Sequence, residues 1–201
     1  GFSSQAGGIL PNIVNPTRGA HTWVMWGTLL LPLLAWLIWL TRTSETRPRL
    51  DTALACTLGL LLFLWAFSWL LGLLAQWRDP AFASSYLSSQ GQPDLASFFQ
   101  AASLRRLSYL GGLLTIATVT WLSLAHLLGK QVTTDTGTHV DTDDASTPDT
   151  QHATRNTPTD HFVLLLTLLA SLLIIAPDFV YLRDYFGYRI NTIFKFYYQA
   201  W

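Results

Sequence analysis

The sequence is poor in charged residues. It contains 12 Lys and Arg against 12 Asp and Glu, so that charged residues make up 12% of the 201 positions and the formal net charge is zero. A soluble domain carries about a quarter charged residues, and the stretch from Trp23 to Leu40 has none. This scarcity excludes an ordinary soluble globular domain. The zero net charge also argues against nucleic acid as a partner, because nucleic-acid binding requires a basic surface.

Cysteine and targeting signals are nearly absent as well. The single cysteine, Cys56, lies in an apolar run, which excludes a disulfide framework and a thiolate metal site. The first residues show no signal-peptide pattern. Because the sequence starts at Gly1 without Met and stops at Trp201 inside an aromatic, apolar stretch, we expect an internal fragment of a longer polytopic protein.

What the sequence does have is long apolar runs. A membrane span needs about 20 mostly apolar residues. Four runs are candidates: 22–40, 52–75, 107–128 and 161–176. The last is short at 16 residues and either ends at Pro177 or continues past the proline with a kink. Residues 181–201 have a helical pattern and lead into a fifth span, and the loop 78–106 is predicted to form an amphipathic helix lying in the membrane surface. The predicted fold class is an all-α, polytopic transmembrane helical bundle.

Four spans place the connecting segments on alternate sides of the membrane. The N-terminal piece, the 78–106 loop and residues 178–195 share one face, and the 41–50 and 129–160 segments share the other. The short 41–50 loop carries Arg42, Arg47 and Arg49, so the positive-inside rule places it in the cytoplasm. The total count runs the other way, since seven Lys and Arg lie on the opposite face against five on this one.

The 129–160 segment differs from the rest of the chain. It holds ten threonines and six aspartates with almost no apolar residues, which predicts a disordered linker between spans. The run Asp141-Thr142-Asp143-Asp144 is like the DxD of metal-dependent sugar transferases. It is also vaguely like a calcium-binding loop, but it lacks the glycine and the distal glutamate of such a loop. We interpret it as a solvated acidic tether, and we interpret His139 and His152 in the same way.

Two arginine-bearing segments flank the first and third spans. In Asn15-Pro16-Thr17-Arg18, Asn15 is expected to cap a helix whose first turn begins at Pro16. Beside this structural interpretation stands a functional one, in which Arg18 reaches a lipid or sugar phosphate at the interface. The pair Arg105-Arg106 is interpreted as a headgroup anchor.

The segment 177–199 is the most informative part of the sequence. It contains five charged residues and five tyrosines, although ionisable groups at membrane depth cost ~2.5–3.5 kcal/mol each. If the segment is helical, one stripe on it holds Tyr181, Tyr185, Tyr188, Thr192, Lys195 and Gln199. Arg183, Asp184, Arg189 and Asn191 fall to either side of that stripe. Arginine forks and a lysine ammonium suit phosphate binding, and Asp178 or Asp184 would orient an arginine, bind a metal or act as a base. Internal ion pairing with an interfacial aromatic belt is the structural alternative.

Two sequence motifs, one near each end of the chain, resemble those of a known family. The motifs are Asn15-Pro16-Thr17-Arg18 and the longer series Tyr181-Leu182-Arg183-Asp184, Phe186-Gly187, Arg189-Ile190-Asn191-Thr192 and Phe194-Lys195-Phe196-Tyr197-Tyr198-Gln199-Ala200-Trp201. Together they are similar to motifs of the Chlor_Arch_YYY membrane proteins of bacteria and archaea. Members of that family more often have Met at the position of Ile190.

The resemblance implies a relation to integral-membrane glycosyltransferases that take a sugar from a polyprenyl-phosphate donor at the outer membrane face. Their catalytic acid lies in a loop that would precede Gly1, so no catalytic residue is named. The implied phosphate-binding and substrate-binding residues are Arg18, Arg183, Asp184, Arg189, Asn191 and Lys195. Tyr185 and Tyr188 are implied to stack on sugar.

The implied partners are membrane lipids and a polyprenyl-phosphate sugar, and the implied location is a bacterial or archaeal cell membrane that the chain crosses several times. No cofactor or metal site is evident, and the need for a divalent metal is left open. The alternative function is that of a non-enzymatic multi-pass membrane protein, either a transporter or an assembly scaffold, in which the charged residues pair with one another.

Overall fold

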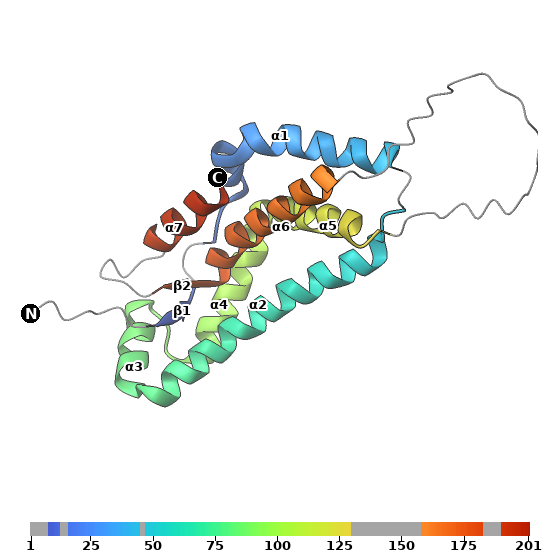
Figure 1. The fold of residues 1–201 in the computed structure, drawn as a ribbon. Helices are drawn as coiled ribbons and strands as arrows, with labels where there is room; N and C mark the ends of the chain where they lie inside the picture. Colours follow the sequence, from blue (N-terminus) through green and yellow to red (C-terminus); the bar gives the residue numbers. More distant parts are fainter. Residues whose placement is uncertain (1–7, 13–15, 45–46, 130–157, 183–189) are drawn as a thin grey trace, which may run out of the picture.

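Helices dominate the computed structural model, which describes residues 8–12, 16–44, 47–129, 158–182 and 190–201 (Figure 1). The helices are α1 (Gly19–Thr43), α2 (Leu50–Arg78), α3 (Pro80–Ser89), α4 (Leu95–Ser108), α5 (Leu110–Leu127), α6 (Pro158–Phe179) and α7 (Ile190–Ala200). Two short antiparallel strands, β1 (Ile9–Pro11) and β2 (Val180–Leu182), form the single sheet of the described residues. The 130–157 part of the predicted linker lies outside the described residues.

Four helices are long and apolar enough to cross a membrane. They are α1, α2, α5 and α6, with 25, 29, 18 and 22 residues and mean hydropathies of 1.8, 2.2, 1.5 and 2.4. Even α5, the shortest, reaches about 27 Å at 1.5 Å per residue, which is close to the ~30 Å hydrocarbon core. The prediction of an all-α multi-pass bundle is confirmed.

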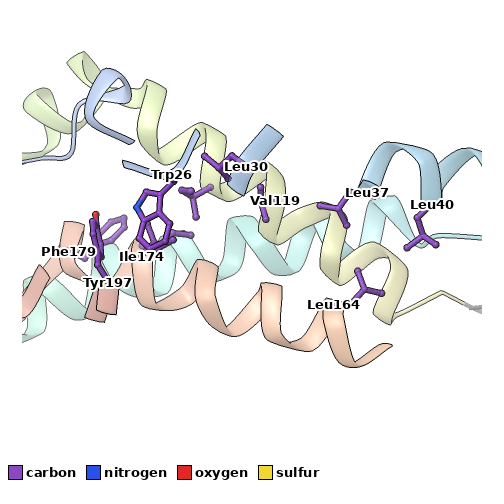
Figure 2. Close-up of a cluster of buried hydrophobic side chains, with 11 residues drawn as sticks. Trp26, Leu30, Leu37, Leu40, Val119, Leu164, Ile174, Phe179 and Tyr197 are labelled. Atoms are coloured by element: carbon purple, nitrogen blue, oxygen red, sulfur yellow. The ribbon is translucent and has the colours of Figure 1, made fainter. Parts of the chain in front are cut away.

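The main core lies between α1, α5, α6 and α7, as Figure 2 shows. Helix α5 is central, because it packs against α1, α2 and α6. Leu37 of α1 and Leu164 of α6 are fully buried there. In contrast, Leu58, Leu62 and Leu70 of α2 are more than half exposed, as expected for side chains that face lipid.

Residues 176–201 agree with the prediction at one point and depart from it at another. Helix α6 continues through Pro177 to Phe179, which was the second alternative for the fourth span, because a proline near the end of a helix removes only its own N–H and the last carbonyls find other donors. The chain then forms β2 before α7 begins. The prediction of one continuous helix over 181–201 is therefore wrong.

The 78–106 loop contains two helices, α3 and α4, where one amphipathic helix was predicted. A position of this segment in the membrane surface stays a prediction. Helix α4 packs against the C-terminal half of α2, where the Phe99 and Trp69 rings stack with centroids 3.9 Å apart. In the same contact the indole Nε1 of Trp65 donates to the hydroxyl of Ser103 at 3.3 Å. A buried stacked aromatic pair is favourable, so these contacts hold α4 against α2.

The first span also begins differently from the prediction. Helix α1 starts at Gly19 with Arg18 in the N-cap position and without a side-chain cap, so Pro16 precedes the helix. The prediction of a helix start at Pro16 is wrong, and Asn15 lies outside the described residues. Three glycines allow this end of α1 to approach α5: a Cβ on Gly19 would lie 3.2 Å from the Gly111 backbone, and one on Gly112 would lie 2.6 Å from the Thr22 hydroxyl.

Helix α4 has a titratable N-cap, which makes its first turn sensitive to pH. Asp94 accepts a hydrogen bond from the backbone N–H of Ser97 at 2.7 Å, and this bond lowers the pKa of the carboxyl. A lowered folded-state pKa adds stability above the usual carboxyl pKa of about 3.9, and that stability is lost as the pH falls. We expect hydrogen-exchange protection of the Ser97 amide to fall between roughly pH 5 and pH 3. In Asp94→Asn, which keeps a capping side chain without a proton to gain, protection should stay level. An equal fall in both proteins would contradict this role of Asp94.

Candidate functional site

The structure joins the beginning and the end of the sequence at one end of the bundle. Strand β1 pairs with β2, with Ile9 opposite Leu182 and Pro11 opposite Val180. Helix α1 starts here, and α2 and α6 end here (Figure 1). We call this end the sheet end. The shared face predicted for the N-terminal piece, the 78–106 loop and the 178–195 segment agrees with this arrangement.

The C-terminal carbonyls of α6 are bonded by groups from other elements. The Asn12 side-chain Nδ2 donates to the Pro177 carbonyl at 3.0 Å, and the Asn12 backbone N–H donates to the Phe179 carbonyl at 2.8 Å. Arg106 Nη2 donates to the Asp178 carbonyl at 3.3 Å. A helix leaves its last carbonyls unpaired and ends with a partial negative charge. Asn12 and Arg106 therefore cap α6, and this explains how the helix can continue past Pro177.

Arg106 does not act as the predicted headgroup anchor. Its guanidinium lies 4.7 Å from the centre of the Phe179 ring, and Nη2 donates to the Asn12 carbonyl at 2.7 Å. Burial lowers the pKa of the guanidinium to about 10. Nε and Nη1 are buried and have no hydrogen-bond partner among the described residues. The burial of Arg106 could have been inferred from helical spacing. Ala102 lies three residues after Phe99 and Arg106 four residues after Ala102, and both Phe99 and Ala102 are fully buried.

Thr17 and Asp178 connect the start of α1 to the end of α6. Asp178 Oδ1 accepts hydrogen bonds from the Thr17 hydroxyl at 2.6 Å and from the Thr17 backbone N–H at 3.2 Å. These bonds fix the residue next to Arg18. The charge of Asp178 also acts on Arg106, whose pKa it raises against the larger effect of burial, in keeping with the predicted role of orienting an arginine. Metal binding and base catalysis by this carboxylate stay predictions.

A pair of tyrosines links α3 to the sheet. The hydroxyl of Tyr181 donates to the hydroxyl of Tyr86 at 3.2 Å, and Tyr86 donates to the Pro11 carbonyl at 3.4 Å. Burial, with the neighbouring Tyr181, raises the pKa of Tyr86, so Tyr86 stays neutral. Sequence reasoning missed Tyr86 and its contact with Tyr181, because nothing in the serine-rich 84–90 stretch indicated a partner nearly a hundred residues away.

Two of the implied phosphate-binding side chains are described, and both are exposed. The guanidinium of Arg18 lies 5.2 Å from the centre of the Tyr109 ring. Lys195 is exposed on α7. Asn191 lies in the first turn of α7, although its side chain is outside the description. Also outside the described residues are Arg183, Asp184, Tyr185, Tyr188 and Arg189.

The single stripe predicted on the 181–201 segment does not form. Tyr181 belongs to β2, and its side chain is buried. Thr192 is also buried, and its hydroxyl accepts a hydrogen bond from the Leu182 backbone N–H at 2.9 Å. Lys195 and Gln199 are exposed instead. The amphipathic pattern of α7 therefore divides these residues, burying Thr192 and Tyr197 while leaving Lys195 for solvent, headgroups or substrate.

Hollows of different sizes lie at the sheet end and behind it. A groove of about 700 Å³ between β1, α2 and α3 carries Arg78 and Asp79 beside apolar residues. A cavity of about 10 Å³ lies beside Thr17 and Asp178. A third hollow of about 210 Å³ lies deeper, between α1, α5, α6 and α7. Within the described ranges, no group of three or more His, Cys, Asp or Glu side chains is arranged to hold a metal ion.

Comparison with known proteins gives one match. Residues 1–201, the whole chain, match the sequence profile of the family described as "Uncharacterized membrane protein (DUF2298)". No curated protein and no solved structure matches the chain.

Proposed function

Because the chain belongs to the family described as "Uncharacterized membrane protein (DUF2298)", it is a multi-pass membrane protein, and we propose that it is a glycosyltransferase-like module that binds a polyprenyl-phosphate-linked sugar. The finer family relation to the Chlor_Arch_YYY proteins is part of this proposal. The transfer would break the bond between the anomeric carbon and the phosphate oxygen, and the electron pair would leave with the polyprenyl phosphate. An acceptor hydroxyl would form the new bond and lose its proton to a carboxylate that the resemblance implies outside these residues.

The observation that carries the proposal is the meeting of the two motif regions at the sheet end. The β1–β2 pairing and the Thr17–Asp178 hydrogen bonds hold Arg18 and the start of the Tyr181–Trp201 motif at the same end. Segments about 160 residues apart would not need to meet if each were only an independent interfacial anchor. A site in which residues of both segments bind the same ligand requires the two segments to meet.

The charge at the sheet end supports an anionic ligand. The described cations there outnumber the acids, five to three: Arg18, Arg78, Arg105, Arg106 and Lys195 against Asp79, Asp94 and Asp178. All three acids serve local structure, since Asp79 and Asp94 cap helices and Asp178 holds Thr17. Arg18 and Lys195 are exposed. Their charge is therefore available to a phosphate, for which arginine offers a planar fork and lysine a point charge.

The remaining implied roles stay predictions of the same proposal. Arg183 and Arg189 would share the phosphate with Arg18, and Asp184 and Asn191 would orient the polar groups around it. Tyr185 and Tyr188 would pack against the sugar. The alternative of a transporter or scaffold draws support from Arg106, whose charge serves the structure by capping α6. That alternative requires no preference for a phosphate-bearing lipid.

The test is a binding and transfer experiment on the full-length protein in lipid nanodiscs. Arg18→Gln is expected to weaken the binding of a polyprenyl-phosphate sugar roughly tenfold, equivalent to ~1.4 kcal/mol, because a charge-assisted hydrogen bond to the phosphate is lost. Binding of the corresponding uncharged polyprenol should not change. The matched control is Arg42→Gln, since Arg42 is an exposed arginine at the opposite end of the same helix.

Arg183→Ala and Lys195→Ala complete the test through transfer activity. Each should reduce transfer while the protein stays folded and inserted. Unchanged transfer in both variants, together with equal binding of phosphate and alcohol forms by the wild-type protein, would overturn the proposed function in favour of the non-enzymatic alternative.

A further inference from the structure

A narrow crevice runs between α1 and α6 within the hydrocarbon depth of the bundle. Its volume is about 210 Å³. Its floor is formed by Ile116 and Val119 of α5, and Ala200 of α7 lies at its edge. Trp26 and Leu30 of α1 and Ile174 of α6 also line it, and Figure 2 shows these side chains in the buried cluster together with Val119.

The rims of this crevice face the membrane. Leu29 on α1 is 43% exposed and Leu166 on α6 is 49% exposed, and both line the crevice. Deeper residues such as Leu30 and Ile116 are almost fully buried. An apolar molecule can therefore enter sideways from the lipid without crossing a polar surface.

The size of the crevice selects the kind of occupant. An apolar cavity of about 150 Å³ can hold a benzene-sized group. The crevice, at about 210 Å³, is therefore large enough for a stretch of a single hydrocarbon chain.

The crevice also points toward the sheet end. Ile116 and Ile174 line both the crevice and the small cavity whose wall includes Thr17 and Asp178. Along α6 the crevice extends from Leu166 to Ile174, which is about 12 Å at 1.5 Å per residue, and Asp178 follows one turn later. A chain lying in it would have one end next to Arg18, at the end of the bundle where the cations gather.

Trp26 adds a polar feature at the near end of the crevice. Its side chain is 3% exposed, and the indole Nε1 is buried without a hydrogen-bond partner among the described residues. Its ring contacts that of Tyr197, with centroids 5.4 Å apart. A buried N–H without an acceptor is costly, and an oxygen at the head of a bound lipid would supply the acceptor.

From these features we propose that the crevice between α1 and α6 binds the hydrocarbon chain of an isoprenoid lipid, with its oxygen-bearing end toward Trp26 and the Thr17–Asp178 pair. The inference rests on the proposed function for the identity of the headgroup. It adds the path of the chain, and so makes the protein selective for chain length as well as for phosphate.

The first test compares two isoprenoid phosphates on the full-length protein in nanodiscs. We expect undecaprenyl phosphate to bind roughly tenfold more tightly than dimethylallyl phosphate, because a five-carbon chain is too short to fill the crevice along its length. Ala170→Phe places a ring in the crevice and should bring this ratio close to one. The matched control is Leu169→Phe, since Leu169 is 54% exposed on the same helix and does not line the crevice.

A second variant separates the crevice from its competitor. The groove of about 700 Å³ beside β1 is lined partly by Leu74, so Leu74→Phe should leave the chain-length ratio unchanged. Loss of the ratio in Leu74→Phe and its retention in folded Ala170→Phe would overturn the proposal. Arg18→Gln should weaken both phosphates equally, so a failure of the headgroup site is distinguished from a failure of the crevice.

A crosslinking measurement needs no variant and covers the case in which Ala170→Phe fails to fold. Undecaprenyl phosphate carrying a diazirine in its chain should label the wild-type protein at crevice residues of α1 and α6, such as Leu33 and Thr167. Labelling confined to the exposed face of α2, around Leu58 and Leu62, would overturn the proposal.

Discussion

Replacing Gly112 by alanine is expected to lower the free energy of unfolding by about 1–3 kcal/mol and to weaken phosphate binding at the sheet end. A Cβ at this position would lie 2.6 Å from the Thr22 hydroxyl and 3.0 Å from the Thr17 carbonyl oxygen. The carbonyl belongs to the backbone, so relief requires the start of α1 to move away from α5. That movement pulls Thr17 from Asp178 and displaces Arg18.

Thermal unfolding of the full-length protein measures the first effect, and binding of the polyprenyl-phosphate sugar measures the second. The matched control is Gly59→Ala in α2, where a Cβ would have no neighbour within 4 Å. This control should change stability little, and toward stabilisation, because alanine favours helix over glycine by up to ~1 kcal/mol. Equal destabilisation by the two substitutions would show that α1 does not depend on its close approach to α5.

Phe99→Ala is expected to be more damaging, at about 3–5 kcal/mol. The Phe99 side chain is fully buried and stacks on Trp69 at a centroid distance of 3.9 Å. Gly72 provides the space for its ring, since a Cβ there would lie 2.9 Å from the ring atoms of Phe99. Removing the ring leaves a cavity between α2 and α4 and deprives Trp69 of its stacking partner.

The comparison for this prediction is Phe63→Ala on α2. Phe63 also stacks on an aromatic neighbour, Phe67, but it is 61% exposed, so lipid can replace the missing ring. We expect its unfolding temperature to stay near that of the wild-type protein, while that of Phe99→Ala falls. If both variants unfold at the same temperature, the contact of Phe99 with Trp69 does not hold α4 against α2.

The spans were predictable from the sequence because they depend on length and hydropathy alone. A run such as that of α2 has no alternative to crossing the membrane, and its predicted bounds of 52–75 lie within the observed Leu50–Arg78. Local signals were less reliable at the helix ends. Pro177 indicated either a stop or a kinked continuation, and α6 continues to Phe179 because Asn12 and Arg106 bond its last carbonyls.

The candidate site was predictable in its location and not in its contacts. Alternation of loops placed Arg18 and Lys195 on the same face, but the helical stripe joining Tyr181 to Lys195 was wrong because β2 interrupts it. A strand of three residues has too little sequence for a period to be recognised. The role of Arg106 depends on Asn12 and Asp178, which lie far from it in sequence, so only the weak signal of its spacing from Phe99 and Ala102 was available.

The bonds between Asn12 and the end of α6 also determine when the sheet end can form. Asn12 and Pro177 are 165 residues apart, and translation proceeds at about 5–20 residues per second. Roughly 8–33 s therefore pass between the synthesis of β1 and that of its partner strand. During this interval the first three spans can insert, while Asn12 and Thr17 still lack their hydrogen-bond partners on α6. The sheet end therefore cannot form before α6 and β2 have been synthesised, so a ligand that needs both segments cannot bind the nascent chain earlier.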